Sequence, residues 1–290
     1  MNKPKLEIII VTYNSQFWLK KTLSSLKKEY LDKTKTKVNV TIVDNASEDD
    51  TSGLMKQEFA WASYQQLDSN KGYAVANNLA LKQTEAKYVM LLNSDIEFTP
   101  NSNLDTLLNY LDSNKQVAVI TPRIEFTDGQ LDPACHRGEP TPWASFCYFS
   151  KLEKLFPDSR LFGGYHQLNL PLEKIHQIEA CSGAGMLVRR SAIDQVGLLD
   201  EQFFMYAEDL DWCRRFRDAN FKVVFHPEVK IIHHKYKSGI KSTSQSIARQ
   251  TRNHFYRTML QYYDKHYRKQ YPWIVRFCLR VFIFIKKGAL

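Results

Sequence analysis

Residues 88–98 read YVMLLNSDIEF, and this stretch decides the predicted fold. Its first five residues are apolar without alternation, which predicts a strand covered on both faces, as in an α/β sheet. The next three residues are Asn93, Ser94 and Asp95. Because ligands of such sheets bind just beyond the carboxyl ends of the strands, these three polar side chains are predicted to meet a ligand.

The neighbouring sequence alternates strand-like and helix-like segments. Strands are predicted at 6–11, 38–43, 64–67, 87–92 and 116–120, and helices at 16–28, 51–59, 73–84 and 104–113. This order predicts an α/β fold with a mostly parallel, Rossmann-like sheet flanked by helices. Asp128-Gly129 then predicts a hairpin turn. The remaining predicted segments are an irregular insert at 133–175, strands at 180–190, 223–226 and 229–233, a helix at 210–219, and a helical end.

Charge is distributed unevenly along the chain. The formal net charge is +9, but residues 229–290 carry 14 Lys or Arg and one acid, Asp264, which leaves the preceding part mildly acidic. A basic tail indicates a polyanionic partner, either nucleic acid or an anionic membrane. The five cysteines form no C-x-x-C pair, and the N-terminus runs straight into a strand. These features favour reduced thiols, a cytosolic protein and no signal peptide.

Polar residues follow four of the predicted strands. They are the segments Thr12-Tyr13-Asn14, Asp44-Asn45-Ala46-Ser47, Asn93-Ser94-Asp95 and His233-His234. A single Asp at a strand end is often a cap or a turn residue, but a row of such ends predicts a cleft for a polar ligand. Asp44 could accept the N3–H of a pyrimidine base, and Asp95 could bind a divalent cation together with phosphates. The segment after the first strand lacks glycine, which argues against a dinucleotide fold and a Walker-type NTPase.

A second group of acids lies in residues 203–216, which read FFMYAEDLDWCRRF. Acids at a helix start are favoured by the helix dipole, so capping is one interpretation. However, Glu208, Asp211 and Arg215 share one helix face, while Asp209 points elsewhere. Two acids on different faces suggest two roles, one of which could be that of a general base.

Taken in order, these motifs resemble a known family. The matching segments are IIIVTYNS, TIVDNASEDDT, NKGYAVANN, LLNSD, SGAGMLVRR, LLDEQFFMYAEDLDWCRR and IIHH. The sequence from about residue 6 to residue 238 resembles the inverting family-2 glycosyltransferases with a GT-A fold, and among them the rhamnosyltransferase branch. None of the segments is specific alone, but together they are.

The resemblance implies a role for each matching residue. The residues that it places on the nucleotide-sugar donor are Thr12, Tyr13, Asn14, Asp44, Asn70, Gly72, Asn78, Asn93 and Ser94. Asp95 matches the last acid of an Asp-x-Asp metal motif, and Asp209 matches the catalytic base, with Glu208 beside it. His233 matches a histidine near the metal and the diphosphate, followed five residues later by Ser238.

Two positions depart from the family pattern. Asn93 replaces the first acid of the metal motif, so less negative charge would hold the metal. The family usually has glycines between the histidine and the serine, whereas here the sequence is Lys235-Tyr236-Lys237. This departure leaves open whether His233 or His234 is the metal ligand.

The acceptor side is predicted from the insert and from the later motifs. Arg137 could bind an acceptor phosphate, and Trp143 could stack on a sugar, although packing within the loop is the alternative role of Trp143. Gly183 and Asp211 are assigned to the same side. Residues 1–245 are thus predicted to form the glycosyltransferase domain, with a donor half at about 1–122 and an acceptor half at about 123–245.

The resemblance implies a metal-dependent inverting glycosyltransferase that uses Mg²⁺ or Mn²⁺. The expected donor is dTDP-L-rhamnose, and the expected acceptor is a saccharide or a lipid-linked saccharide for cell-surface polysaccharide. A UDP-hexose is the alternative donor. The alternative functions are a nucleotidylyltransferase, whose Gly-rich loop is absent here, and a non-catalytic sugar- or lipid-binding scaffold. Nucleic acid is not an expected partner because no binding motif is present.

The basic amphipathic helical tail, residues 246–290, ends in an apolar stretch with interleaved cations. Residues 273–285 contain Arg276 and Arg280 and number only 13, whereas a spanning helix needs about 20 apolar residues. Such a pattern is typical of an interfacial anchor on an anionic membrane. The expected location is therefore cytoplasmic and peripheral on the inner face of the cell membrane. Packing of the tail on the catalytic domain or on a partner subunit is the alternative, and the sequence makes no prediction of the oligomeric state.

Overall fold

The structure is a computed structural model that describes residues 3–167, 169–235 and 245–288. Its strands are β1 Leu6–Thr12, β2 Val38–Asp44, β3 Ser63–Gln66, β4 Tyr88–Asn93, β5 Ile96–Phe98, β6 Val117–Glu125, β7 His176–Ile178, β8 Gly185–Arg189 and β9 Lys222–His233. Its α-helices are α1 Gln16–Leu26, α2 Thr51–Glu58, α3 Tyr73–Gln83, α4 Leu104–Ser113, α5 Pro142–Phe149, α6 Leu152–Leu155, α7 Arg190–Val196, α8 Glu208–Asp218, α9 Gln245–His266 and α10 Trp273–Gly288.

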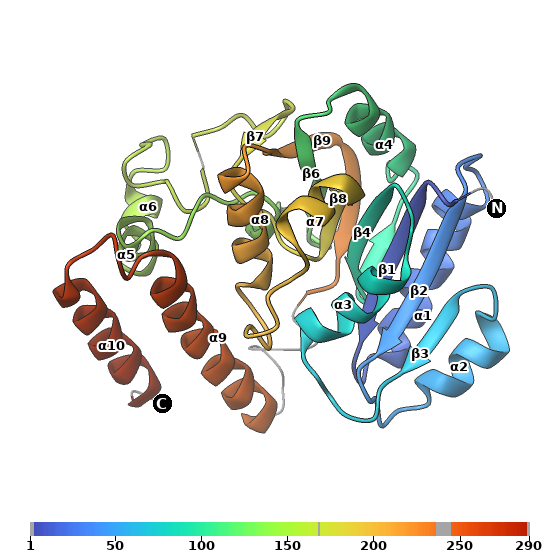
Figure 1. The fold of residues 1–290 in the computed structure, drawn as a ribbon, viewed down its shortest axis with the longest axis horizontal. Coiled ribbons are helices and arrows are strands. Elements are labelled where there is room, and N and C mark those ends of the chain that lie inside the picture. The colour runs from blue at the N-terminus through green and yellow to red at the C-terminus, as the bar shows by residue number, and fades with distance from the viewer. Residues whose placement is uncertain (1–2, 168, 236–244, 289–290) are drawn as a thin grey trace.

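All of these strands join one mixed sheet in the order β3-β2-β1-β4-β8-β6-β9-β5, with β7 paired to β9 (Figure 1). The first four strands of the chain lie side by side in the order β3-β2-β1-β4 and are parallel, as the β-α-β alternation predicted. β8 is antiparallel to both β4 and β6, and β9 is parallel to β6. The α/β prediction is confirmed, and its parallel part is the half that carries the first three polar strand ends.

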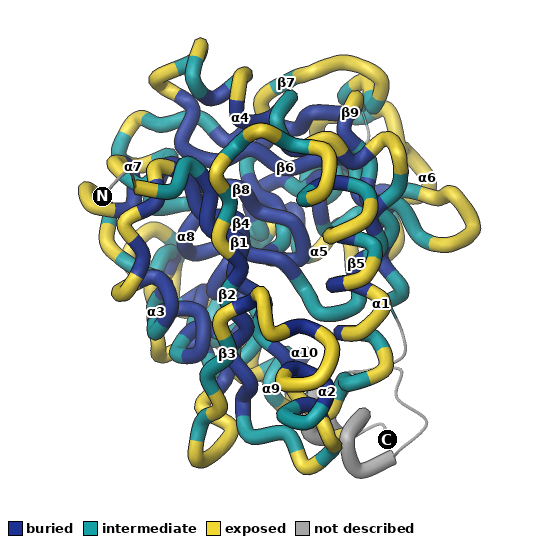
Figure 2. The backbone as a smooth tube through the Cα atoms, turned by 90° about the vertical axis from the view of Figure 1, so that its right-hand side faces the viewer, coloured by how far each residue is buried: buried dark blue, intermediate teal, exposed yellow. Residues whose placement is uncertain are grey.

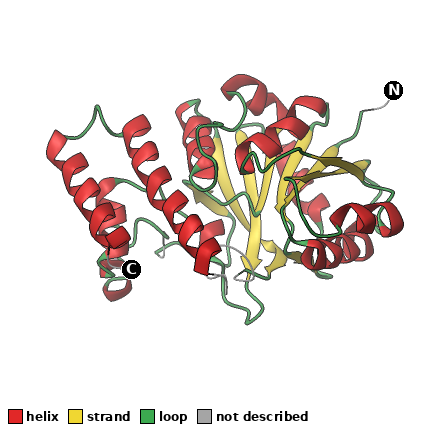
Figure 3. Cartoon of the chain, turned by 90° about the horizontal axis from the view of Figure 1, so that it is seen from below, coloured by secondary structure: helices red, strands yellow, loops and turns green. Residues whose placement is uncertain are grey.

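The central strands form because their side chains are buried on both faces. Every residue of β4 except Asn93 is buried, and so is every residue of β1 except Val11. Figure 2 shows the central strands as the most buried part of the chain, and Figure 3 shows helices on both sides of them. The continuous apolar runs in the sequence are therefore explained by a sheet in the middle layer.

Two segments are more regular than the sequence predicted. Residues 133–175 contain the helices α5 and α6. The two strands predicted on either side of Pro227 are one strand, β9, whose register against β6 shifts between Pro122 and Arg123. The predicted hairpin turn is present: Gly129 has a φ of +80°, and Glu125 pairs with Leu131 in an isolated antiparallel bridge.

The C-terminal helices pack on the rest of the chain. Tyr262 and Tyr263 of α9 are buried, as is Tyr267 directly after it, and α10 lies beside α9 at one end of the molecule (Figures 1 and 3). Both oxygens of Asp264 accept hydrogen bonds from Arg276, at 2.6 Å each, which fixes the two helices together. In the part of the chain that the structure describes, no helix is both long enough and apolar enough to span a bilayer.

Candidate active site

The strand register brings the predicted donor residues together. Thr12 pairs with Asp44 across β1 and β2, and Val11 pairs with Asn93 across β1 and β4. The polar carboxyl ends of three parallel strands therefore lie side by side. The hydroxyl oxygen of Thr12 is buried and has no hydrogen-bond partner, so a ligand at this edge would find a free donor and acceptor.

Asp44 is fully buried at this edge and already has two partners. Its Oδ2 accepts a hydrogen bond from the Tyr64 hydroxyl at 2.6 Å, and its Oδ1 accepts one from the backbone N–H of Ser47 at 2.8 Å. A carboxylate has about four lone-pair sites, so two remain. A nucleobase N–H could therefore donate a third hydrogen bond to Asp44. The neighbouring Tyr64 was not predicted from the sequence.

Two loops beside this edge are tied to one another by polar side chains. Asn14, at a φ of 48°, donates its backbone N–H to Ser47 Oγ at 2.9 Å, and its side-chain oxygen accepts from the backbone N–H of Glu48 at 2.7 Å. Tyr13, between the strand end and Asn14, is exposed. These bonds hold the loops after β1 and β2 in one arrangement at this edge of the sheet.

The loop before α3 needs its glycine. Gly72 has a φ of +85°, and a Cβ there would lie 2.4 Å from the carbonyl oxygen of Phe204. Its backbone N–H donates to Asn70 Oδ1, which also accepts from the Asn45 amide. Gly72 therefore allows the donor loop and the segment before α8 to touch, which is a packing role in addition to the predicted diphosphate role.

Asp95 and His233 face each other across β5 and β9. Ile96 pairs with His233 in an antiparallel register, and His233 Nε2 lies 3.1 Å from Asp95 Oδ1. The Asn93 amide nitrogen lies 3.5 Å from the same Nε2. The sequence predicted these three side chains to share a site, and the structure brings them together.

Asp132 is a member of this site that the sequence analysis missed. It is fully buried, and its Oδ2 lies 2.8 Å from His233 Nδ1, while Lys235 donates to its Oδ1 at 3.0 Å. Burial acts to lower the pKa of His233, but hydrogen bonds to Asp132 and Asp95 outweigh it and raise that pKa to about 9. Burial acts in the opposite direction on Asp132, whose pKa is held well below its usual range by His233 and Lys235.

The structure distinguishes the two adjacent histidines. His234 points away from Asp95: its ring stacks on Trp18 at a centroid distance of 4.7 Å, and its Nε2 lies 2.7 Å from Glu97 Oε2. Only His233 of the pair is directed at Asp95. Ser238 lies outside the described residues.

The residues at this site fit a divalent cation in part. No group of three or more His, Cys, Asp and Glu side chains able to hold a metal occurs within residues 3–167, 169–235 and 245–288. Asp95 Oδ1 and His233 Nε2 nevertheless lie 3.1 Å apart, with the Asn93 side-chain amide beside them, so a cation that displaces the His233 proton would meet two protein ligands. A cation such as Mg²⁺ commonly takes one or two protein ligands and completes its shell with water and substrate phosphates, so this set suits an ion that arrives with a nucleoside diphosphate.

The carboxylate pair at the start of α8 lies in a different electrostatic environment. Glu208 is buried, and its Oε2 has no hydrogen-bond partner. Burial, together with the nearby charge of Asp209, raises the pKa of Glu208 to about 8. Asp209 Oδ2 accepts a hydrogen bond from the Arg137 guanidinium at 2.7 Å, and both side chains are largely buried. Burial therefore favours the protonated form of Glu208, whereas Asp209 is ion-paired with Arg137.

The backbone before this pair is strained. Tyr206 and Ala207 have φ values of 71° and 66°, which non-glycine residues adopt at a cost of about 1–3 kcal/mol each. This turn lets α8 begin at Glu208. The segment is held on the other side by Tyr73, whose backbone N–H donates to Phe204 O at 2.8 Å and whose hydroxyl donates to Gly183 O at 3.0 Å.

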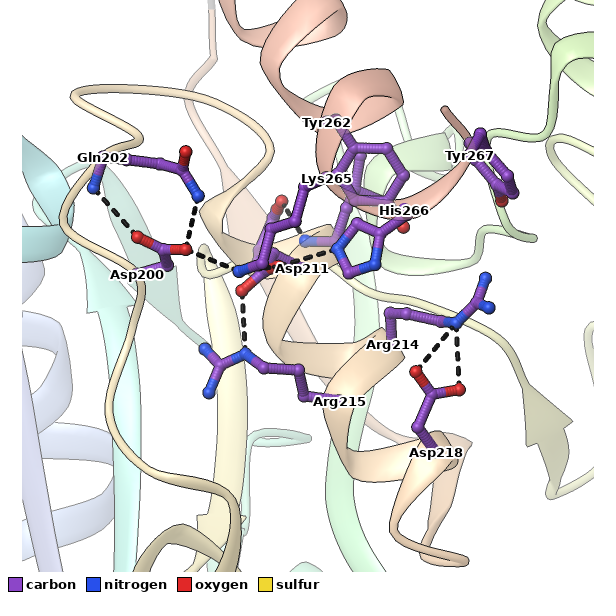
Figure 4. Close-up of polar contacts among 12 residues, drawn as sticks. Asp200, Gln202, Asp211, Arg214, Arg215, Asp218, Tyr262, Lys265, His266 and Tyr267 are labelled. Carbon is purple, nitrogen blue, oxygen red and sulfur yellow. Dashed lines mark hydrogen bonds and ion pairs between the residues drawn. The ribbon is translucent and has the colours of Figure 1, made fainter. Parts of the chain in front are cut away.

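Asp211 has structural partners from two helices. It is fully buried; its Oδ2 accepts from Arg215 at 2.8 Å, and its Oδ1 lies 2.8 Å from His266 Nε2 and 2.5 Å from Lys265 Nζ (Figure 4). Burial acts to raise the pKa of Asp211, but these partners lower it to about 2. The acceptor role predicted for Asp211 is replaced here by docking of α9 on α8.

The other predicted residues lie as follows. Asn78 is buried and bonds to the backbone of Leu199, so its side chain holds α3 on the segment after α7. Ser94 Oγ lies 3.3 Å from Ser15 Oγ. The Trp143 indole N–H donates to Leu161 O at 2.8 Å, so the structure gives this ring a partner within its own loop.

Ser182 is a further polar residue that the sequence analysis did not name. Its hydroxyl oxygen is buried and unpartnered, and it precedes Gly183 in the SGAG segment. Asn93 donates its backbone N–H to Ala184 O at 3.3 Å, which places this segment beside the end of β4. Ser182 is the first residue of the SGAG motif, so that motif is the sequence signal from which its place could have been predicted.

Comparison with known proteins identifies the family of this chain. Residues 7–197 match the family described as Glycosyl transferase family 2, and residues 154–290 match Glycosyl transferase family group 2. The chain belongs to glycosyl transferase family 2, and it is a glycosyltransferase.

Two relatives within this family are named as rhamnosyltransferases. The chain is 28% identical over 286 residues to the N-acetylglucosaminyl-diphospho-decaprenol L-rhamnosyltransferase of Mycobacterium tuberculosis, which covers 93% of this chain and 89% of the relative. It is 27% identical over 243 residues to the rhamnosyltransferase WbbL of Escherichia coli, covering 79% and 83%. Among solved structures, it superposes on the mannosyltransferase PcManGT from Pyrobaculum calidifontis, in complex with GDP-Man and Mn²⁺, with a TM-score of 0.58 at 15% identity, covering 98% of this chain and 70% of that one. This likeness shows the GT-A fold.

Proposed function

We propose that this glycosyltransferase moves L-rhamnose from dTDP-L-rhamnose to a hydroxyl of a saccharide or lipid-linked saccharide, in the synthesis of cell-surface polysaccharide. The observation that supports the reaction type is the separation of two acidic sites: Asp95 with His233 at the strand edge, and Glu208 with Asp209 at the start of α8. Rhamnose is proposed because two relatives are named as rhamnosyltransferases.

The strand edge is proposed to bind the donor. Asp95 and His233 would hold a divalent cation, Mg²⁺ or Mn²⁺, with the Asn93 amide beside them, and the cation would neutralise charge on the departing diphosphate. Asp132 keeps the His233 ring oriented through Nδ1, as carboxylates commonly do for metal-binding histidines. Asp44 and Tyr64 would meet the base.

The start of α8 is proposed to activate the acceptor. The acceptor hydroxyl oxygen attacks the anomeric carbon, and the bond from that carbon to the diphosphate oxygen breaks on the opposite side, so the carbon is inverted. Asp209 takes the proton of the attacking hydroxyl. Protonated Glu208 does not compete as a base, and its free Oε2 could accept from a sugar hydroxyl. The buried Nε of Arg137 also lacks a partner, so an acceptor phosphate could bind it.

The C-terminal helix α10 is proposed to contact an anionic membrane at the cytoplasmic face. Trp273, Phe277 and Phe284 are exposed along one side of α10, and Arg280 lies among them. We keep the division at residue 245 as a proposal for where the catalytic domain ends in sequence, although α9 is docked on that domain.

A titration with nucleotides and a transfer assay test this function. Calorimetry with Mn²⁺ should give tight binding of dTDP, weaker binding of UDP and weakest binding of GDP; GDP as the tightest ligand would contradict the donor. Transfer from dTDP-L-rhamnose should require the metal and should be lost in Asp95→Ala. The matched control is Asp194→Ala, because Asp194 is an exposed carboxylate paired with Arg190 on α7. A near-normal rate in Asp95→Ala would refute the metal assignment.

A further inference from the structure

A second apolar surface lies on the insert between β6 and β7. Trp143 and Phe146 of α5 are exposed, and so are Leu155, Phe156 and Leu161 in and after α6. Large exposed apolar patches are uncommon on soluble monomers and mark interaction sites or membrane contacts. Within its own loop, Trp143 bonds to Leu161 and packs against Phe146 at a centroid distance of 5.6 Å, so the patch is held together by its own contacts.

This surface is joined to α10 in space. Phe149, at the end of α5, packs against Phe282 of α10 with a centroid distance of 4.8 Å, and Phe282 also contacts Tyr256 of α9 at 6.4 Å. α5, α6 and α10 gather at the end of the molecule away from α2 and β3 (Figure 1). The exposed side chains of α5–α6 and of α10 therefore belong to one end of the protein, although more than 100 residues separate them in sequence.

The charge on this end is positive. Between residues 142 and 162, which hold α5, α6 and the exposed apolar side chains, Lys151, Lys154 and Arg160 are exposed with one exposed acid, Asp158. Glu153 is buried and paired with His166, and on α9 the acid Asp264 is neutralised by Arg276. On and just before α10 the exposed charged side chains are Arg268, Lys269, Arg280 and Lys286. Aromatic and aliphatic side chains interleaved with cations suit an anionic lipid surface, in which the rings enter the interface and the cations meet the headgroups.

We propose that α5, α6 and α10 together form one membrane-contacting surface, so that the catalytic insert itself, and not the C-terminal helix alone, docks on anionic lipid. Four residues separate Arg137, the partner of Asp209, from the start of α5. Docking through α5 thus sets the acceptor side of the site close to the lipid. The inference deepens the proposed function and rests on it for the use of a lipid-linked acceptor.

Vesicle flotation of the full chain tests this surface. Trp143→Ser/Phe146→Ser and, separately, Leu155→Ser/Phe156→Ser should each lower partition onto vesicles of phosphatidylglycerol and phosphatidylcholine about tenfold or more at low salt, with α10 intact. The matched control is Phe17→Ser/Trp61→Ser. These two rings are 62% and 40% exposed, against 55% for Phe146 and 45% for Trp143, but they lie on α1 and before β3. Melting temperature establishes that each variant is folded.

Partition within twofold of the parent in both insert variants would overturn the proposal. So would a parent dimer that falls to a monomer in those variants by light scattering, because the surface would then face a second copy of the chain. Flotation uses neither donor nor acceptor. A failure of the membrane surface and a failure of rhamnose transfer are thus measured separately.

Discussion

Two regions of this protein are positioned by different interactions: the strand edge with Thr12, Asp44 and Asn93, which we propose binds the donor and call the donor edge, and the α8–α9 region. The donor edge is positioned by parallel strands, whose backbone register places Thr12 opposite Asp44. The α8–α9 region is positioned by buried charges, because Glu139 and Asp211 together gather four cations and two tyrosine hydroxyls. The partners of Glu139 are Arg214, Arg217, Tyr262 and Tyr267. Asp211 pairs with Arg215 and Lys265, and also contacts the ring nitrogen of His266.

The comparison teaches where changes should be tolerated. Apolar strands stabilise a site through area buried, so a polar residue at the strand end can change chemistry without loss of fold. A buried carboxylate with several partners is different: removing it leaves its partners uncompensated, and the cost falls on stability. We therefore expect substitutions at the donor edge and at Asp209 to lower activity with little change in stability. Substitutions at Glu139 and Asp211 should lower the free energy of unfolding.

The largest effect is expected at the base. Asp209→Asn should lower transfer roughly 10²–10⁴-fold, because general-base catalysis contributes about this much, while dTDP binding measured by calorimetry stays close to the parent. Asp218→Asn, at the exposed end of the same helix, is the control and should keep the parent rate. A loss smaller than tenfold in Asp209→Asn would move the role to Glu208.

A large effect on stability is expected at Glu139. Glu139→Gln removes a buried charge that accepts from the Tyr262 hydroxyl at 2.5 Å and from the Tyr267 hydroxyl at 2.6 Å, so the free energy of unfolding should fall by about 3 kcal/mol. Urea denaturation measures this change. Glu58→Gln, which breaks an exposed pair with Lys20, should cost less than about 1 kcal/mol. Equal costs in the two variants would refute the contrast between the regions.

A smaller effect is expected behind the metal site. Asp132→Asn removes the charged partner of His233 Nδ1 and should weaken Mn²⁺ binding in the presence of dTDP about 10–100-fold, as loss of a carboxylate behind a metal-binding histidine commonly does. Calorimetric titration with Mn²⁺ measures this affinity independently of the transfer reaction. Asp128→Asn, on the exposed hairpin, is the control. Unchanged Mn²⁺ affinity would mean that Asp132 only holds the loop.

The smallest effect is a pH dependence at Glu208. The pKa of Glu208 rises from an ordinary value of 4.5 to about 8 in the folded protein, chiefly through burial and then through the charge of Asp209. Between those pH values the folded state binds the proton that the unfolded state has released, so this group lowers stability as pH rises from 4.5 to 8. Thermal melts across that range should show a shallower decline in Glu208→Gln; an identical slope would contradict the assignment.

The sequence predicted the parallel part of the sheet well because its signals are local. An unbroken apolar run followed by polar residues is enough to predict β4 and the place of Asp95, and the parallel order follows from the alternation. The same reasoning placed Arg215 and Asp211 on one face of α8, where they form an ion pair at 2.8 Å.

The rest depended on contacts that no local pattern contains. Asp132 reaches His233 across 101 residues, and Arg137 reaches Asp209 across 72. Asp211 looked available to an acceptor because the helix that covers it, α9, contributes its partners 55 residues later. A carboxylate on a helix face is assigned correctly only when the elements packed against that face are known.

The docking of α9 has a consequence for the order of synthesis. A ribosome completes the strands that carry Thr12, Asp44 and Asn93 long before it reaches Tyr262 and His266, and the N-terminal parts of a chain generally fold first. Until α9 arrives, Glu139 and Asp211 lack the tyrosine, lysine and imidazole partners that the finished fold gives them. We therefore expect the parallel strand edge to assemble early, whereas Glu139 and Asp211 gain their full set of partners only after α9 has been translated.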